Sequence, residues 1–143
     1  FGGLLGNGNV AFFDTHWNII NIMDVNTGNT ISTATVNNNT PTATSNQYYM
    51  SNGVSPFLFN DNLYFLGYFS KGGSSNRKPF VAKLNSQGTL VLNKIFEIPL
   101  GYFHYISENG KNLQFMGGIN AFNTNNTKIF TLTTDENLNV INK

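Results

Sequence analysis

The sequence predicts an all-β protein built from three four-stranded antiparallel blades of a β-propeller. Apolar runs of 4 to 8 residues, rich in Phe, Tyr, Ile and Val, alternate with Asn, Gly and Asp turns, and helical periodicity is absent. In addition, residues 62–93 recur at 112–143 without a gap, at an offset of 50 residues. A repeat of about this length made of short strands is typical of a propeller blade.

Identical residues carry the first part of this repeat, and conservative matches such as Asn85/Asp135, Leu90/Val140 and Val91/Ile141 continue it. The identical pairs are Asn62/Asn112, Leu63/Leu113, Phe65/Phe115, Gly67/Gly117, Asn76/Asn126, Lys78/Lys128 and Phe80/Phe130. The middle unit is predicted to form strands at about 54–60, 62–70, 79–85 and 89–98. The last unit is predicted to form strands at 101–108, 112–120, 128–134 and 138–142.

The first unit is a shorter version of the same pattern. Residues 9–12 match 62–65, and the turn at Asp24 matches the turn at Asn85. One domain, 1–143, is therefore expected to contain blades at about 1–37, 53–98 and 101–143.

The second strand of the middle unit is apolar at four consecutive positions, 63–66. A strand with one solvated face alternates apolar and polar residues, whereas a strand buried on both faces is apolar throughout. We therefore expect this strand to lie between two neighbouring sheets. Gly67 and Gly117 close the second strand of their units, and the backbone there is expected to approach a neighbour closely or to bulge.

Three units are too few for a closed propeller, which has about 4 to 8 blades. An incomplete ring is expected: the chain is a fragment of a larger propeller, which we favour, or it is closed by oligomerisation, with two chains forming a six-bladed ring. The outer faces of the first and last units should then pack on another chain, on a missing part of the same chain or on a second copy. Otherwise, apolar blade faces would lie in water.

Composition excludes several classes of function. Charged residues make up 10% of the chain and the net charge is +1, which argues against a nucleic-acid surface. No apolar stretch approaches 18 residues, so membrane insertion is not expected. Cysteine is absent, and the turns at Asp24, Asn85 and Asp135 favour hairpin turns over calcium loops, so no metal or cofactor is expected. Low charge with abundant Asn, Thr, Ser and Gly is common in secreted and cell-surface β-proteins.

A family resemblance also indicates a secreted or cell-surface β-propeller. The segment NLYFLG at 62–67, followed by PFVAKLNSQG at 79–88 and TLVLNK at 89–94, resembles the SBBP-type bacterial β-propeller repeat, which is kelch-like. That repeat has a strand ending in Gly, a segment F-V-x-K-L-[ND]-x-x-G and a further strand. The resemblance implies a propeller on a secreted or cell-surface protein, usually without enzymatic activity, and it transfers no catalytic residues.

The long loops 37–53, 71–78 and 121–127 are predicted to share one face of the blades, opposite the tight turns, and binding residues usually gather on such loops. The ligand-binding candidates are Asp14, His16, Trp17, Tyr48, Tyr49, Arg77 and Phe122 near this face and His104 on the inner strand of the last unit. Trp17 with Tyr48 and Tyr49 could form a sugar-stacking platform, but aromatic packing between blades is the favoured interpretation. Asp14 and His16 could be half of a metal or acid–base pair, but a local hydrogen-bonded pair is favoured.

These observations predict a non-catalytic binding or assembly module of a secreted or cell-surface protein. Its partner is expected to be another protein chain or the remainder of the propeller. A lectin-like propeller that binds glycans through loop aromatics is the alternative. A fragment of a propeller glycosidase is a second alternative, although four Asp and three Glu scattered singly do not nominate the acid pair that hydrolysis needs.

Overall fold

The described residues form strands joined by turns and short connections. The computed structural model describes residues 2–14, 19–36, 46–50, 56–71, 77–120 and 127–143, with 46–50 described by the backbone alone. Within these residues there are thirteen strands and no helix. Aromatic and β-branched residues fill the strands while Asn, Asp and Gly fill the turns, so the predicted all-β class is confirmed.

In the middle and last units the predicted strands agree with observed ones to within about three residues at either end, and the prediction for 112–120 coincides with β11. In chain order, the observed strands are β1 (Gly2–Leu4), β2 (Val10–Asp14), β3 (Ile19–Met23), β4 (Thr30–Thr35), β5 (Asn46–Met50), β6 (Phe57–Phe59), β7 (Asn62–Lys71), β8 (Arg77–Leu84), β9 (Leu90–Ile95), β10 (Gly101–Asn109), β11 (Asn112–Asn120), β12 (Thr127–Thr134) and β13 (Val140–Asn142).

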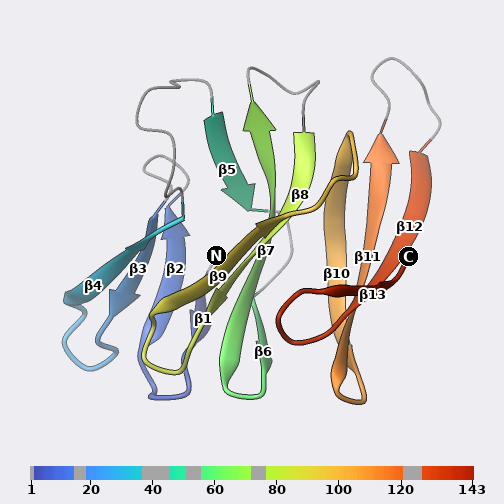
Figure 1. Cartoon of the computed structure of the whole chain (residues 1–143). Helices are drawn as coiled ribbons and strands as arrows, with labels where there is room; N and C mark the ends of the chain where they lie inside the picture. The colour runs from blue at the N-terminus through green and yellow to red at the C-terminus, as the bar shows by residue number, and fades with distance from the viewer. Residues whose placement is uncertain (1, 15–18, 37–45, 51–55, 72–76, 121–126) are drawn as a thin grey trace.

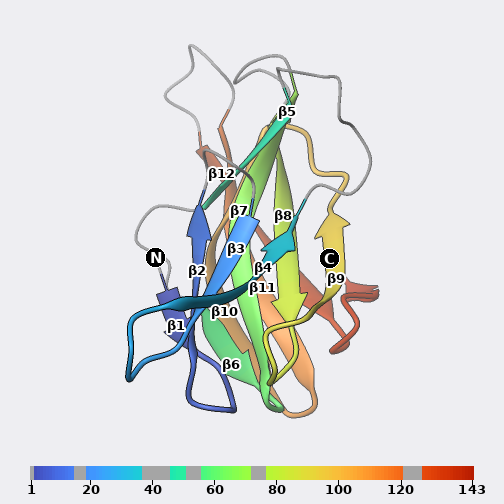
Figure 2. The same cartoon turned by 90° about the vertical axis from the view of Figure 1, so that its left-hand side faces the viewer.

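These strands form three antiparallel sheets. The first sheet has the order β1-β2-β3-β4, and the last sheet has the order β10-β11-β12-β13. The middle sheet has the order β5-β7-β8-β9, with β6 also paired to β7. Figure 1 shows the middle sheet between the other two, and Figure 2 shows the stack from the side of the first sheet. Three antiparallel sheets were predicted, and their assignment as propeller blades stays a prediction.

One edge of β7 is paired by two strands in succession. β6 pairs with the first part of β7, around Leu63, and β5 pairs with its last part, from Gly67 to Lys71. The sequence prediction placed 46–50 in a loop, and that is wrong. A strand of ten residues presents more main-chain donors and acceptors than the three residues of β6 can satisfy, so a second strand completes the edge. The middle sheet therefore extends upstream of the predicted blade at 53–98.

The middle sheet is buried on both faces, as the four consecutive apolar residues predicted. Leu63 and Phe65 lie in the core shared with the first sheet, whereas Tyr64 and Leu66 lie in the core shared with the last sheet. All four side chains are almost inaccessible to solvent. Because successive side chains of a strand point to opposite faces, β7 contributes to both cores at once.

Three equivalent hairpin turns join the third and fourth strands of the sheets. At Asp24, Asn85 and Asp135, a side-chain oxygen accepts a hydrogen bond from the main-chain N–H two residues further on, at 2.7, 3.0 and 2.9 Å, respectively. This is the local bonding that makes Asx residues favourable in turns, and it confirms the hairpin-turn interpretation. Hairpin turns lie at the lower end of the sheets in Figure 1, and the strand ends that border 72–76 and 121–126 lie at the upper end.

Candidate functional site

The outer face of the first sheet, which points away from the middle sheet, carries large apolar side chains. Alternate residues of β2 are buried in the core, so Val10 and Phe12 point outward. Strand pairing places Val10 between Leu4 of β1 and Met23 of β3. Leu4 is 61% exposed and the other three are half-buried. The first sheet therefore presents a group of large apolar side chains to its surroundings, beside the polar Asn21 and Thr33 on the same face.

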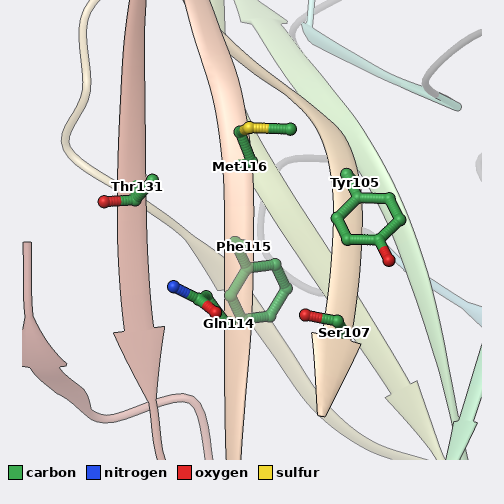
Figure 3. A pocket seen from close by; sticks show the side chains of 6 residues that line it. All are labelled: Tyr105, Ser107, Gln114, Phe115, Met116 and Thr131. Carbon is green, nitrogen blue, oxygen red and sulfur yellow. The ribbon is translucent and has the colours of Figure 1, made fainter. Parts of the chain in front are cut away.

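The outer face of the last sheet carries a more mixed surface. Strand pairing sets Tyr105 beside Met116, and Met116 beside Thr131. Tyr105 is 55% exposed, Met116 is 42% exposed, and Ile129 on the same face is 76% exposed. Tyr105, Met116 and Thr131, with Gln114 and neighbouring side chains, line a shallow hollow of about 170 Å³, which Figure 3 shows across three adjacent strands.

A cluster of aromatic and basic side chains lies where β8 and β10 begin. The guanidinium carbon of Arg77 lies 5.3 Å from the ring centre of Tyr68 and 4.9 Å from that of Tyr102. The ring of Tyr102 meets the imidazole of His104 edge to face, with centres 4.6 Å apart. Within the described chain, the enclosed Nε of Arg77 has no hydrogen-bond partner. We call Tyr68, Arg77, Tyr102 and His104 the arginine–aromatic cluster.

The cluster connects two residues that the sequence nominated, Arg77 and His104, through one that it did not, Tyr102. Tyr68 was also missed, because tyrosines inside an apolar strand look like core residues. Two aromatic rings restrict the guanidinium to a narrow range of orientations by cation–π contact. An arginine held in this way can donate to a carboxylate or a sugar hydroxyl, and tyrosine and histidine rings can stack on an apolar ligand face.

Other polar groups tie the last sheet to the middle sheet. The hydroxyl of Tyr64 and the ammonium group of Lys83 both donate to the main-chain carbonyl of Glu136, at 2.8 and 2.9 Å. The ammonium group of Lys94 donates to the carbonyl of Leu138 at 2.6 Å. All three donors belong to the middle sheet and both acceptors belong to the β12–β13 turn. We call this set the turn latch.

The turn latch and the β12–β13 turn shift the pKa values of two side chains, Tyr64 and Asp135. Burial raises the pKa of the Tyr64 hydroxyl far above its ordinary value, and the nearby charges of Glu136 and Asp135 raise it further. Hydrogen bonds from Asn139 hold the pKa of the Asp135 carboxyl below its ordinary value. Both shifts arise from groups that stabilise the fold, since they favour the neutral phenol and the ionised carboxylate that make these bonds.

The remaining candidates divide into three groups. Asp14 ends β2, opposite Ile19. Tyr48 and Tyr49 lie in the strand β5, not in a loop as predicted, and their side chains are outside the described atoms. His16, Trp17 and Phe122 lie outside the described residues. The aromatic platform and the Asp14–His16 pair therefore stay predictions.

In the part of the chain that the structure describes, no three His, Cys, Asp or Glu side chains are grouped to hold a metal ion. No helix of membrane-spanning length and hydropathy occurs in those same ranges. Comparison with protein-family models, with curated proteins and with solved structures gives no match to this chain.

Proposed function

We propose that this chain is a non-catalytic binding and assembly module of a secreted or cell-surface protein, in which sheets stack as propeller blades. The observation that carries the proposal is the contrast between the middle sheet and its neighbours. Among the described residues, the middle sheet has apolar cores on both faces, whereas the first and last sheets have a core on one face only. Exposed apolar faces of this kind favour contact with another protein surface.

The use of the charged residues also supports a binding role over a catalytic one. Lys83 and Lys94 donate to carbonyls of the turn latch, and Lys78 pairs with Glu97 at 2.5 Å. The carboxylate of Asp135 closes its own turn. These groups hold strands and turns in place, and they are five of the 15 charged residues of the chain.

Retention of the purified protein on cells of its source organism tests this function. Wild-type protein should remain on the washed cell surface, and Phe12→Lys should reduce the retained amount at least about fivefold, because a charge would enter the apolar face. Val25→Lys is the matched control, since Val25 is an exposed apolar residue in the β3–β4 turn and not in a strand of this face. Absent retention of the wild type, or equal retention of both variants, would contradict the proposal.

Glycan binding is the second candidate, and the arginine–aromatic cluster supports it. Tyr68 and Tyr102 flank one guanidinium, and His104 extends the aromatic surface from Tyr102. Sugar rings stack their apolar faces on aromatic side chains while an arginine binds hydroxyl or carboxylate oxygens. An acidic oligosaccharide is therefore the glycan class that fits this cluster.

A glycan array with wild-type protein tests this candidate directly. Binding to acidic glycans should be lost in Tyr102→Ala and should persist in Tyr105→Ala, which removes an exposed tyrosine outside the cluster. An array without hits, or equal loss in both variants, would exclude the cluster as a glycan site.

A further inference from the structure

The two contacts between sheets inside the chain are built in the same way. The equivalent residues of β2, β7 and β11 are Phe12, Phe65 and Phe115, each paired across the sheet to an equivalent position of the next strand. The residues that follow them are Phe13, Leu66 and Met116, and they point to the opposite face of the same strand. Each sheet therefore has one face that carries the phenylalanine and one face that carries the following residue.

Both internal contacts join one kind of face to the other. Phe65 of the middle sheet shares a core with Phe13 of the first sheet. Phe115 of the last sheet shares a core with Leu66 of the middle sheet. We call the face with Phe12, Phe65 or Phe115 the leading face, and the opposite face the trailing face. In both cores a leading face packs on the trailing face of the preceding sheet.

Within the described ranges, the leading face of the first sheet and the trailing face of the last sheet have no partner sheet. Phe12, on the leading face of the first sheet, is half-buried, although its equivalents Phe65 and Phe115 are fully buried. Met116, on the trailing face of the last sheet, is 42% exposed, although its equivalent Leu66 is fully buried. The chain thus carries both halves of an interface that it already makes twice.

We propose that a second copy of this chain fills both faces, with the leading face of one copy packed on the trailing face of the other. This inference rests on the proposed stacking of sheets as blades. Two copies bring six sheets together, which lies within the range of about 4 to 8 blades that closes a propeller, whereas three copies would exceed it. Head-to-tail contacts of this kind form a closed ring when the rotation between successive copies adds up to a full turn, and no apolar face then remains free.

Each of the two free faces has a polar residue at a position where the middle sheet has an apolar one. On the leading face, Asn21 is paired to Phe12, where the middle sheet has Ala82 paired to Phe65. On the trailing face, Thr131 is paired to Met116, where the middle sheet has Val81. Amide and hydroxyl groups therefore replace apolar ones on both sides of the proposed contact. Such mixed surfaces are typical of interfaces between separately folded chains, so the dimer should be reversible.

Sedimentation of the full chain over a range of concentrations tests the dimer. The mass should rise from that of one chain to that of two. Phe12→Lys and Met116→Lys should each keep the protein monomeric at concentrations where the wild type is dimeric, and Val25→Lys should behave as the wild type. Both substituted positions are accessible to solvent, so the single chains should remain folded, as circular dichroism can verify.

Mixing the two variants distinguishes a head-to-tail contact from any other. The Phe12→Lys copy keeps an intact trailing face and the Met116→Lys copy keeps an intact leading face, so an equimolar mixture should form a one-to-one complex through a single contact. Failure of this mixture to associate while the wild type dimerises would overturn the proposed geometry.

Other outcomes would also overturn the inference. A wild type that stays monomeric at all concentrations, a dimer that neither variant weakens, or a series of larger oligomers would each exclude the two-copy ring. If the wild type is monomeric but Phe12→Lys still loses retention on cells, the leading face binds a different protein, and the proposed function survives without this dimer.

Discussion

The hydroxyl of Tyr64 donates a 2.8 Å hydrogen bond to the main-chain carbonyl of Glu136, 72 positions further along the chain. Tyr64 lies in β7 and Glu136 lies in the turn between β12 and β13, so this bond joins the middle sheet to the last one. The same carbonyl accepts a second bond from Lys83 at 2.9 Å. Two side chains of the middle sheet therefore donate to one main-chain acceptor of the last sheet.

Tyr64→Phe should lower the free energy of unfolding by about 1 kcal/mol, which is the usual net value of one internal hydrogen bond. The loss stays modest because the carbonyl keeps its bond from Lys83. Urea denaturation measures the change. Tyr105→Phe is the control, since Tyr105 is exposed, and it should change the stability by less than about 0.5 kcal/mol. A Tyr64→Phe protein as stable as the wild type would show that the bond contributes nothing.

Alkali should weaken the fold through the same residue. Burial raises the pKa of Tyr64 above its ordinary value of 10.0, so the folded protein holds this proton more tightly than the unfolded chain does. The contribution is complete below about pH 10 and is lost as the pH rises above that value. Thermal unfolding at increasing pH should show a decline that is shallower in Tyr64→Phe. Identical declines would contradict the assignment to Tyr64.

Acid should weaken the β12–β13 turn. Hydrogen bonds from Asn139 lower the pKa of Asp135 below its ordinary value of 3.8. Its contribution is therefore present above about pH 4 and is lost as the pH falls below that value. Asp135→Asn should flatten this acid limb of the stability profile, because an amide cannot titrate, and Asn85 shows that Asn supports the equivalent turn. An unchanged acid limb in thermal scans would argue against this role.

Gly117→Ala should destabilise the protein by about 3 kcal/mol or more. A Cβ atom at Gly117 would lie 2.2 Å from the main-chain oxygen of Tyr102 and 2.6 Å from the ring of Phe130, so the backbone would have to move. Gly110→Ala is the control: its φ of +61° costs strain, but no atom lies within 4 Å, and the loss should be about 1 kcal/mol. Denaturant midpoints compare the two. Equal losses would mean that the clash is relieved without cost.

Leu138→Gly should destabilise the protein by about 2 kcal/mol although it removes backbone strain. Leu138 has a φ of +62° at the turn position where the middle sheet has Gly88 with a φ of +85°. Relief of the left-handed strain gains about 1 kcal/mol, whereas loss of a fully buried Leu side chain costs about 3 kcal/mol. A stabilised variant in urea denaturation would show that strain outweighs burial at this turn.

Most of the fold could be predicted from patterns formed by residues that lie close together in the sequence. Four apolar residues in a row at 63–66 required two buried faces, and both cores contain them. The close approach expected at Gly117 is also found, at the oxygen of Tyr102 and opposite a bulge in β10. These features depend on residues that are neighbours in the sequence, so the sequence displays them directly.

Features that depend on distant partners could not be predicted. The strand β5 has little apolar alternation, and it forms because β7 leaves an edge that β6 is too short to pair. The arginine–aromatic cluster brings Arg77 onto Tyr102 only because the middle and last sheets pack together. Packing between sheets has no period in the sequence, so Arg77 and His104 could be nominated separately but not joined.

The donors and the acceptors of the turn latch differ in how much sequence change they tolerate. Its donors are the side chains of Tyr64, Lys83 and Lys94, but its acceptors are main-chain carbonyls of Glu136 and Leu138. A main-chain carbonyl is supplied by any residue type, so position 136 can drift freely without loss of the attachment. Each donor position can be filled only by a long side chain with a polar tip. Mutational tolerance should therefore be high at position 136 and low at 64, 83 and 94.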